Sequence, residues 1–360
     1  MSTQTPLAPA PPGASAGPVR TQRRLPRFVP LALFLGGIAL GALLSAVTAG
    51  FSIALTVIYG VILGTLAVYL VSRSVEGKRK STDRLVTTVV TSAFVLAMIP
   101  LVSLIYTVLK NGLPRLDSTF FNSSMLGVVG EGGGAYHAIL GTVVITLLTT
   151  VISVPIGLLT AIYLVEYGTG RLKQAITFFV DVMTGIPSIV AGLFAYALFR
   201  IFFGTGIRLG IMGAVALAVL MIPVVVRSAE EVLKLVPNEL REAAYALGVP
   251  KWRTIVKVVI PTSIAGLGTG ITLAVARVIG ETAPLLVTVG LITGTNLDPF
   301  DGRMATLPVF AYYQLTQPGV PPEFGIERAW TAALLLIMLV MALNIVARLI
   351  SRFFAPKTGR

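Results

Sequence analysis

The stretch "VPNELREAAYALGVPKWRTI", residues 236–255, carries two short helical patterns between two long apolar runs. Pro237 suits the first turn of a helix, where no N–H donor is needed. Apolar side chains then recur at helical spacing up to Leu247, and Gly248 is typical of the residue just past a helix C-terminus. Pro250 opens a second amphipathic piece. The stretch therefore predicts a compact helix–turn–helix.

The composition on either side of this stretch identifies the class of protein. Of the 360 residues, 55% are hydrophobic and 12% are charged, which is more apolar surface than a soluble domain can bury. Eight stretches are long and apolar enough to cross a hydrocarbon layer of roughly 30 Å. They lie near 29–49, 51–72, 85–109, 137–164, 174–202, 206–228, 259–290 and 329–351. The sequence predicts an all-α polytopic membrane protein. A DNA-binding role for the helix–turn–helix is disfavoured, because both of its ends run into spans.

The same pattern divides the chain into regions. We expect a disordered tail over 1–28, a transmembrane hairpin with a basic loop over 29–84, and a six-span core over 85–355 with a water-exposed loop at 229–258. The first two spans are separated by almost nothing, which favours the hairpin. The spacing of Gly37 and Gly41 would let its helices approach closely.

Positive charge predicts the orientation in the membrane. Of the 28 lysines and arginines, 21 fall in segments that lie inside if the N-terminus is cytoplasmic. Six fall in the outside segments: Lys110, Arg115, Arg200, Arg208, Arg303 and Arg328. This asymmetry favours cytoplasmic termini and a cytoplasmic 229–258 loop. It also explains most of the net charge of +13, so no nucleic-acid partner is expected.

Several chemistries are excluded or disfavoured by what the sequence lacks. The chain has no cysteine and one histidine, His137, so structural disulfides, thiolate metal sites and a His-rich metal centre are excluded. No G-x-x-x-x-G-K-[ST] run occurs, so ATP hydrolysis would need another polypeptide. No Ser/His/Asp set suggests hydrolysis. We therefore predict a chain that is not an enzyme, with no catalytic residue, no metal and no cofactor of its own.

Arg277 and Glu281 place opposite charges inside the predicted span 259–290. A charge at the bilayer centre costs roughly 2.5–3.5 kcal/mol even on the gentler insertion scale. Residues four apart face the same side of a helix, so the two can pair. One interpretation is a neutralising pair that holds helices together. The other is a site on a substrate pathway, since an arginine can donate two parallel hydrogen bonds to an oxyanion.

The helix–turn–helix and three further stretches carry a resemblance to a known family. "EAAYALG" (242–248) followed by "IP" (260–261) is similar to the EAA loop of ABC-importer permeases. The stretches "AIYLVEYG" (161–168), "GIPSIVAGL" (185–193) and "ARVIGETAPLL" (276–286) are similar to those of PstA-type permeases of phosphate-specific importers. The resemblance covers about residues 85–355, and the N-terminal hairpin departs from it.

This resemblance implies a permease subunit that carries inorganic phosphate across the cell (inner) membrane. The implied partners are a second homologous permease, an ATPase dimer that uses ATP and Mg, an extracytoplasmic phosphate-binding protein and membrane lipid. The implied ATPase-coupling residues are Glu242, Ala243, Ala244 and Gly248. The candidate pathway residues are Arg277, Glu281, Thr282, Ser188 and Arg227. For Ser188 and Arg227, packing and interface anchoring are the alternatives, and Glu166 is expected to be structural.

Two other functions stay open at this point. One is a permease for another oxyanion, such as sulfate or molybdate, which would share the EAA loop. The other is a membrane scaffold or sensor that couples phosphate status to a kinase through the same loop. Flux of labelled phosphate would separate both from a phosphate permease.

Overall fold

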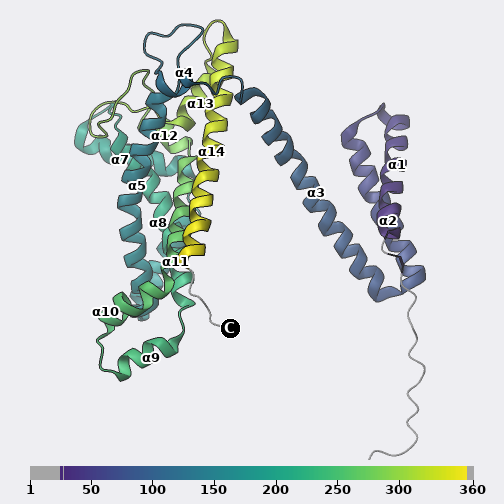
Figure 1. Ribbon diagram of the computed structural model, residues 1–360, viewed down its shortest axis with the longest axis horizontal. Coiled ribbons are helices and arrows are strands. Elements are labelled where there is room, and N and C mark those ends of the chain that lie inside the picture. Colours follow the sequence, from purple (N-terminus) through teal and green to yellow (C-terminus); the bar gives the residue numbers. More distant parts are fainter. Residues whose placement is uncertain (1–24, 27, 355–360) are drawn as a thin grey trace, which may run out of the picture. The chain divides into compact units, whose positions relative to one another are not determined.

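The computed structural model describes residues 25, 26 and 28–354 (Figure 1). Every regular element in this part of the chain is a helix. Seven helices are long and apolar enough to cross a membrane. The bent pair α6 (Gly170–Thr184) and α7 (Ser188–Phe203) makes an eighth if it is one span. The predicted all-α fold with about eight spans is confirmed. Most of the predicted tail over 1–28 lies outside the described residues.

The described residues form two compact units, one ending at Leu104 and one beginning at Ile105. In the first unit, α1 (Val29–Ala49) and α2 (Ile53–Glu76) form an antiparallel hairpin. Gly37 lies directly against the backbone of Gly64. A Cβ added to Gly41 would stand 2.5 Å from the backbone nitrogen of Gly60. Small residues on both helices therefore allow close backbone contact, as the glycine spacing predicts.

A buried ion pair stabilises the end of this hairpin. The carboxylate of Glu76 accepts hydrogen bonds from Arg84 at 2.5 and 2.9 Å and from the Ser72 hydroxyl at 2.8 Å. Arg84 belongs to α3 (Lys78–Gly112), which contains the predicted third span. The helix continues without a break through residues 84 and 85, where we placed the start of the core.

The second unit is built on a bundle of four long helices (Figure 1). They are α5 (Tyr136–Ile162), α8 (Gly210–Lys234), α11 (Ile260–Ile279) and α14 (Pro322–Phe354). Helix α8 lies between α5 and α11, and α14 packs on α11. Buried side chains from the first three helices, such as Ile145, Met221 and Val278, form the main apolar cluster. This bundle is the frame on which the candidate sites lie.

Two of the predicted spans are interrupted. The helix axis turns by 109° between α6 and α7, at Gly185–Pro187. The span predicted over 259–290 stops at Ile279 and resumes as α12 (Ala283–Thr288). A proline at 284 has no N–H and would clash with the carbonyl of Gly280 in a continuous helix, which explains the second break. At the first break, Gly185 and Pro187 are themselves residues that disfavour a continuous helix.

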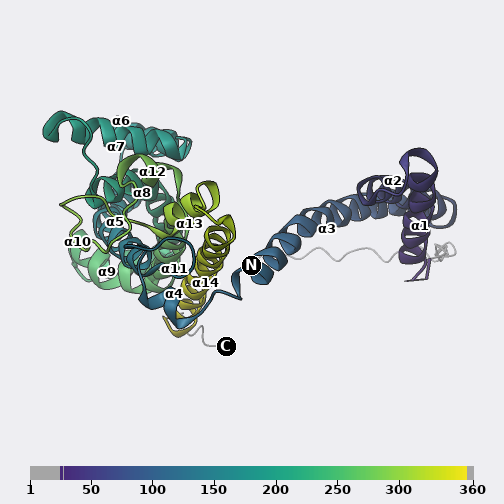
Figure 2. The same ribbon diagram turned by 90° about the horizontal axis from the view of Figure 1, so that it is seen from above.

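The two ends of the bundle carry different short elements (Figures 1 and 2). One end holds α4 (Ser118–Asn122), α13 (Leu307–Thr316) and the loops around them. There the buried Arg328 donates to the carbonyls of Gly130 and Gly132 at 2.8 and 3.0 Å. The opposite end holds α9 (Asn238–Ala246) and α10 (Lys251–Thr254). The segments 111–136 and 295–325, which carry the predicted outside residues Arg115 and Arg303, therefore gather away from the 229–258 loop.

Candidate coupling loop and substrate pathway

The 229–258 segment, here called the coupling loop, has the helix–turn–helix that its sequence predicts. Pro237 precedes α9, and Gly248 follows it with a φ of +73° that side chains with a Cβ rarely adopt. The turn is closed by Gly248 N–H donating to the Tyr245 carbonyl at 2.9 Å and Val249 N–H donating to the Ala244 carbonyl at 3.1 Å. Pro250 then begins α10. Local sequence signals alone account for this geometry.

The predicted coupling residues lie on a loop that presents apolar surface. Glu242, Ala243 and Gly248 are exposed, and Ala244 is buried. Large apolar side chains beside them are exposed as well: Leu235, Leu247 and Trp252. Leu247 has 84% of its surface open. Exposed apolar side chains on a loop at the end of the bundle suit contact with another protein.

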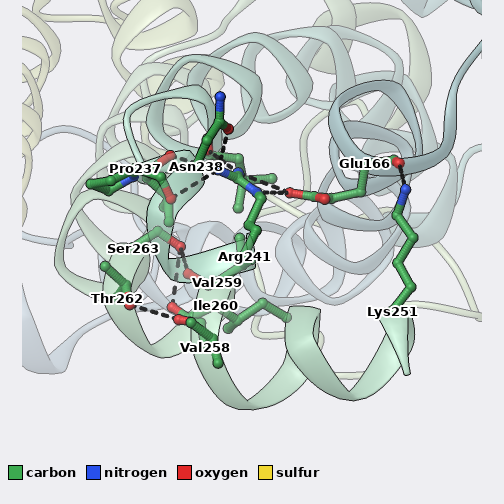
Figure 3. A network of polar contacts seen from close by, with 12 residues as sticks. Glu166, Pro237, Asn238, Arg241, Lys251, Val258, Val259, Ile260, Thr262 and Ser263 are labelled. Carbon is green, nitrogen blue, oxygen red and sulfur yellow. Dashed lines mark hydrogen bonds and ion pairs between the residues drawn. The ribbon is translucent and has the colours of Figure 1, made fainter. Parts of the chain in front are cut away.

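One arginine ties the coupling loop to the bundle (Figure 3). Arg241, on α9, donates through Nε and Nη2 to Oε1 of Glu166 at 3.0 and 2.9 Å. It also donates to the carbonyls of Val236 at 2.6 Å and Leu233 at 3.1 Å, at the end of α8. Only 11% of the arginine side chain and 5% of the glutamate side chain are exposed. Glu166, which is expected to be structural, thus has Arg241 as its partner. The sequence did not reveal this contact.

Lys251 makes a second contact with Glu166. Its Nζ donates to the backbone carbonyl of Glu166 and stands 5.0 Å from the ring centroid of Tyr167. Glu166 and Tyr167 lie in a wide-turned π-helix, η1 (Tyr163–Tyr167), that continues α5. A second π-helix, η2 (Ile255–Val259), follows α10 and leads into α11. Both halves of the helix–turn–helix therefore meet one residue at the end of α5.

Arg277 and Glu281 do not pair as predicted. Arg277 is exposed near the end of α11, whereas half-buried Glu281 follows the helix in the break. Its backbone N–H donates to the Val278 carbonyl at 3.2 Å. Among the described residues, no ion pair joins Arg277 to Glu281 or to any other side chain. The expectation that both lie on one helix face fails because α11 ends before Glu281.

Two other pathway candidates lie where helices restart. Ser188 is the first residue of α7, and Thr282 precedes α12; both are half-buried. Helices α7 and α12 pack together, so that a Cβ added to Gly192 would stand 2.6 Å from Cα of Pro284. Thr282 also lines an open, mostly apolar groove of about 490 Å³ beside Tyr312 and Trp330. Because α7 packs on α12, Ser188 and Thr282 lie at the starts of neighbouring helices.

Arg227 lies in a charged cluster on the part of α8 nearer the coupling loop. It pairs with Asp181 of α6 and, at 2.7 Å, with Glu230 of α8. Lys234 also reaches Glu230, at 2.7 Å. The guanidinium therefore links the broken span to α8. Whether Arg227 anchors α8 at the membrane interface or contacts phosphate stays a prediction.

Comparison with known proteins identifies the family. The family model "Binding-protein-dependent transport system inner membrane component" matches residues 153–360, which include the broken span and the coupling loop. "Phosphate transport system permease protein PstA 1" of Mycobacterium tuberculosis is 47% identical over 294 residues, 81% of this chain and 94% of that protein. The PstA protein of Pasteurella multocida is 38% identical over 283 residues, 78% of this chain and 97% of its own length.

A solved structure supports the fold alone. The bacterial alginate ABC transporter, in complex with an alginate-bound periplasmic protein, aligns with a TM-score of 0.55 and 12% identity. The alignment covers 78% of this chain and 98% of that one. With its apolar spans and its loop geometry, the chain belongs to the family of binding-protein-dependent transport system inner membrane components, as a multi-pass membrane protein.

Proposed function

We propose that this chain is the permease subunit of an ATP-driven importer that moves inorganic phosphate across the cell membrane. The observation that carries the proposal is the identity of 47% and 38%, over about four fifths of the chain, with proteins named as phosphate transport permeases. An exposed arginine inside a predicted span adds a physical reason. Arg277 has no ion-pair partner among the described residues, and its planar fork matches a phosphate oxyanion.

The importer would need proteins that this chain does not supply. We assign ATP hydrolysis, with its Mg, to a separate ATPase dimer that docks on the exposed face of α9 and the turn after it. A second, homologous permease completes the membrane pathway, and an extracytoplasmic binding protein delivers phosphate. The pathway should expose Arg277 to the anion without holding it tightly, because a conduit must release what it admits. The Glu281 carboxylate would accept a hydrogen bond from the O–H group of a protonated phosphate and repel sulfate, which carries no proton.

Uptake by the reconstituted complex tests this function. Proteoliposomes containing both permeases and the ATPase, supplied with binding protein, should accumulate radiolabelled phosphate only when ATP is present. Unlabelled arsenate should compete and sulfate should not. Preferential uptake of sulfate or molybdate would reassign the substrate. Partner binding without any flux would indicate a scaffold or sensor.

The orientation has its own test. The chain has no cysteine, so single cysteines report sidedness directly. Ser118 and Glu239 are exposed at opposite ends of the bundle. In intact cells, an impermeant thiol reagent should label Ser118→Cys and leave Glu239→Cys unlabelled until the membrane is permeabilised. The reverse pattern would place the coupling loop outside and remove the ATPase contact.

A further inference from the structure

We propose that Glu166 and Arg241 are positioning residues for transport, which pass the movement of the coupling loop into α5. The inference rests on the proposed function, because it assumes that a partner moves α9. Helix α9 is nine residues long, with Pro237 before it and Gly248 after it. Without a tie, these two turns would let α9 move while the bundle stayed still.

Both halves of the coupling loop contact Glu166. Arg241 of α9 holds the carboxylate of Glu166, while Lys251 of α10 holds its carbonyl (Figure 3). One residue at the end of α5 is therefore contacted from both sides of the Gly248 turn. A displacement of the loop as one body must displace Glu166 or break these contacts.

Arg241 also joins a third element. It donates through Nη2 to the Leu233 carbonyl and through Nη1 to the Val236 carbonyl, where α8 ends. Its Nε, Nη1 and Nη2 all donate. The guanidinium thus holds the ends of α5 and α8 and the start of α9 relative to one another. Its hydrogen bonds are directional, which an apolar contact would not be.

A buried ion pair is a poor choice for stability alone. Removing two charges from water costs about as much as their attraction returns, so apolar residues of similar size would often serve equally well. The pair is better explained by where it lies. It sits beside the π-helix η1, and Lys251 lies one turn before the π-helix η2. Such wide turns occur often at functional sites.

Helix α5 leads from this contact to the opposite end of the bundle. Thr142, near its other end, accepts a hydrogen bond from Leu307 N–H at 2.8 Å, where α13 begins. Gly141 lies directly against Ala305. Movement of Glu166 along α5 therefore meets the segment that precedes α13. Helix α13 contributes Pro308 and Tyr312 to the groove beside Thr282.

The test separates energy use from transport. Glu166→Gln keeps the size of the side chain and removes its charge. In the reconstituted complex we expect labelled-phosphate uptake to fall at least tenfold while ATP hydrolysis stays within about twofold of wild type. The ATP consumed per phosphate transported would rise accordingly. A purely structural residue would lower both activities in proportion to the amount of assembled complex, which is measured by size-exclusion chromatography.

A matched control uses a second Glu–Arg pair with a buried carboxylate. The Glu76 side chain is 2% exposed, so Glu76→Gln removes the charge that pairs with Arg84 and should leave the ATP-to-phosphate ratio unchanged. A second variant replaces Glu166 and Arg241 with cysteines, in a chain that otherwise has none. Its uptake should be low, and a bis-maleimide of matching length should restore it at least threefold. A mono-maleimide should not.

Three results would overturn the inference. They are an unchanged ratio in Glu166→Gln, an equal rise in Glu76→Gln, and no recovery on cross-linking of a complex that retains its ATPase. These results differ from a failure of the proposed function, in which the wild-type complex itself moves no phosphate. If the wild type moves another oxyanion, the same ratio is measured with that ion.

Discussion

Arg241 and Arg277 belong to the same unit and meet opposite surroundings. The fold supplies Arg241 with a buried carboxylate and two carbonyls. It leaves Arg277 exposed and without an ion-pair partner among the described residues. The guanidinium of Arg241 donates its hydrogen bonds within the chain and holds helices in place. The guanidinium of Arg277 lies inside a predicted span without an ion-pair partner among the described residues, so it needs water, an anion or another subunit. The comparison separates a positioning arginine from a candidate binding one.

The largest effect on uptake should come from Arg277. We expect Arg277→Gln to lower labelled-phosphate uptake about 10- to 100-fold, since a hydrogen bond to a charged group is worth about 1.5–3 kcal/mol. Arg277→Lys should recover little of it, because a point charge does not reproduce the planar fork. Uptake is measured at equal amounts of assembled complex.

The double variant Arg277→Leu with Glu281→Leu distinguishes the two interpretations of the charges. It should remain as inactive as Arg277→Gln, because the two residues do not pair in the structure. Uptake at the wild-type rate would instead mean that Arg277 needs only neutralisation. Glu281→Gln should keep most phosphate uptake and admit more labelled sulfate.

The turn after α9 should give the next largest effect. Gly248→Val places a β-branched residue at a φ of +73°, at a cost of about 1–2 kcal/mol. Among the described residues, apart from its chain neighbours, no atom lies within 4 Å of a Cβ added there, so the cost is in the backbone. We expect uptake and phosphate-stimulated ATP hydrolysis to fall about tenfold together. Gly248→Asn is the control, because asparagine tolerates this conformation and should stay near wild type.

Substitution of Arg227 should have a smaller effect on uptake if this arginine is paired within the chain, as Arg241 is, and does not bind phosphate, as proposed for Arg277. Arg227→Gln leaves Asp181 and Glu230 without their arginine, but the arginine side chain is 32% exposed and solvent screens the pairs. We expect a loss of about 1 kcal/mol or less in the stability of the assembled complex, read as a lower thermal midpoint, with uptake reduced threefold or less. A large rise in KM for phosphate with an unchanged thermal midpoint would favour the exit-contact interpretation.

The hairpin should contribute least to uptake. Gly37→Leu would force α1 away from Gly64, whereas a Cβ added to the neighbouring Gly36 would meet no described atom beyond its own stretch of helix within 4 Å. We expect Gly37→Leu to speed hydrogen exchange or proteolysis in the hairpin, and Gly36→Leu to leave both unchanged. Neither should alter uptake, because the hairpin belongs to a compact unit of its own and carries none of the candidate coupling or pathway residues. Equal effects of the two variants would contradict the close glycine contact.

Local chemistry explains what the sequence predicts well. The apolar runs identify the spans, and Pro237, Gly248 and Pro250 place the helices of the coupling loop because each acts on its own backbone. The contact between Arg241 and Glu166 joins residues 75 apart, and no local signal reports it. Pro284 indicates a break near Gly280, but the apolar run around it favours one continuous span over 259–290. The roles of the pathway and coupling residues stay predictions until uptake is measured.

The exposed leucines of the coupling loop have a consequence for the life of the chain in the cell. Leu235 and Leu247 are 81% and 84% open at the end of the bundle that carries the loop. Apolar area left in water costs about 25 cal/mol per Å² and invites association with other apolar surfaces. Copies without a docked partner therefore present a surface that quality-control proteases and chaperones recognise. The amount of chain that persists should follow the supply of its partner, so balanced subunit ratios would arise by removal of orphan copies.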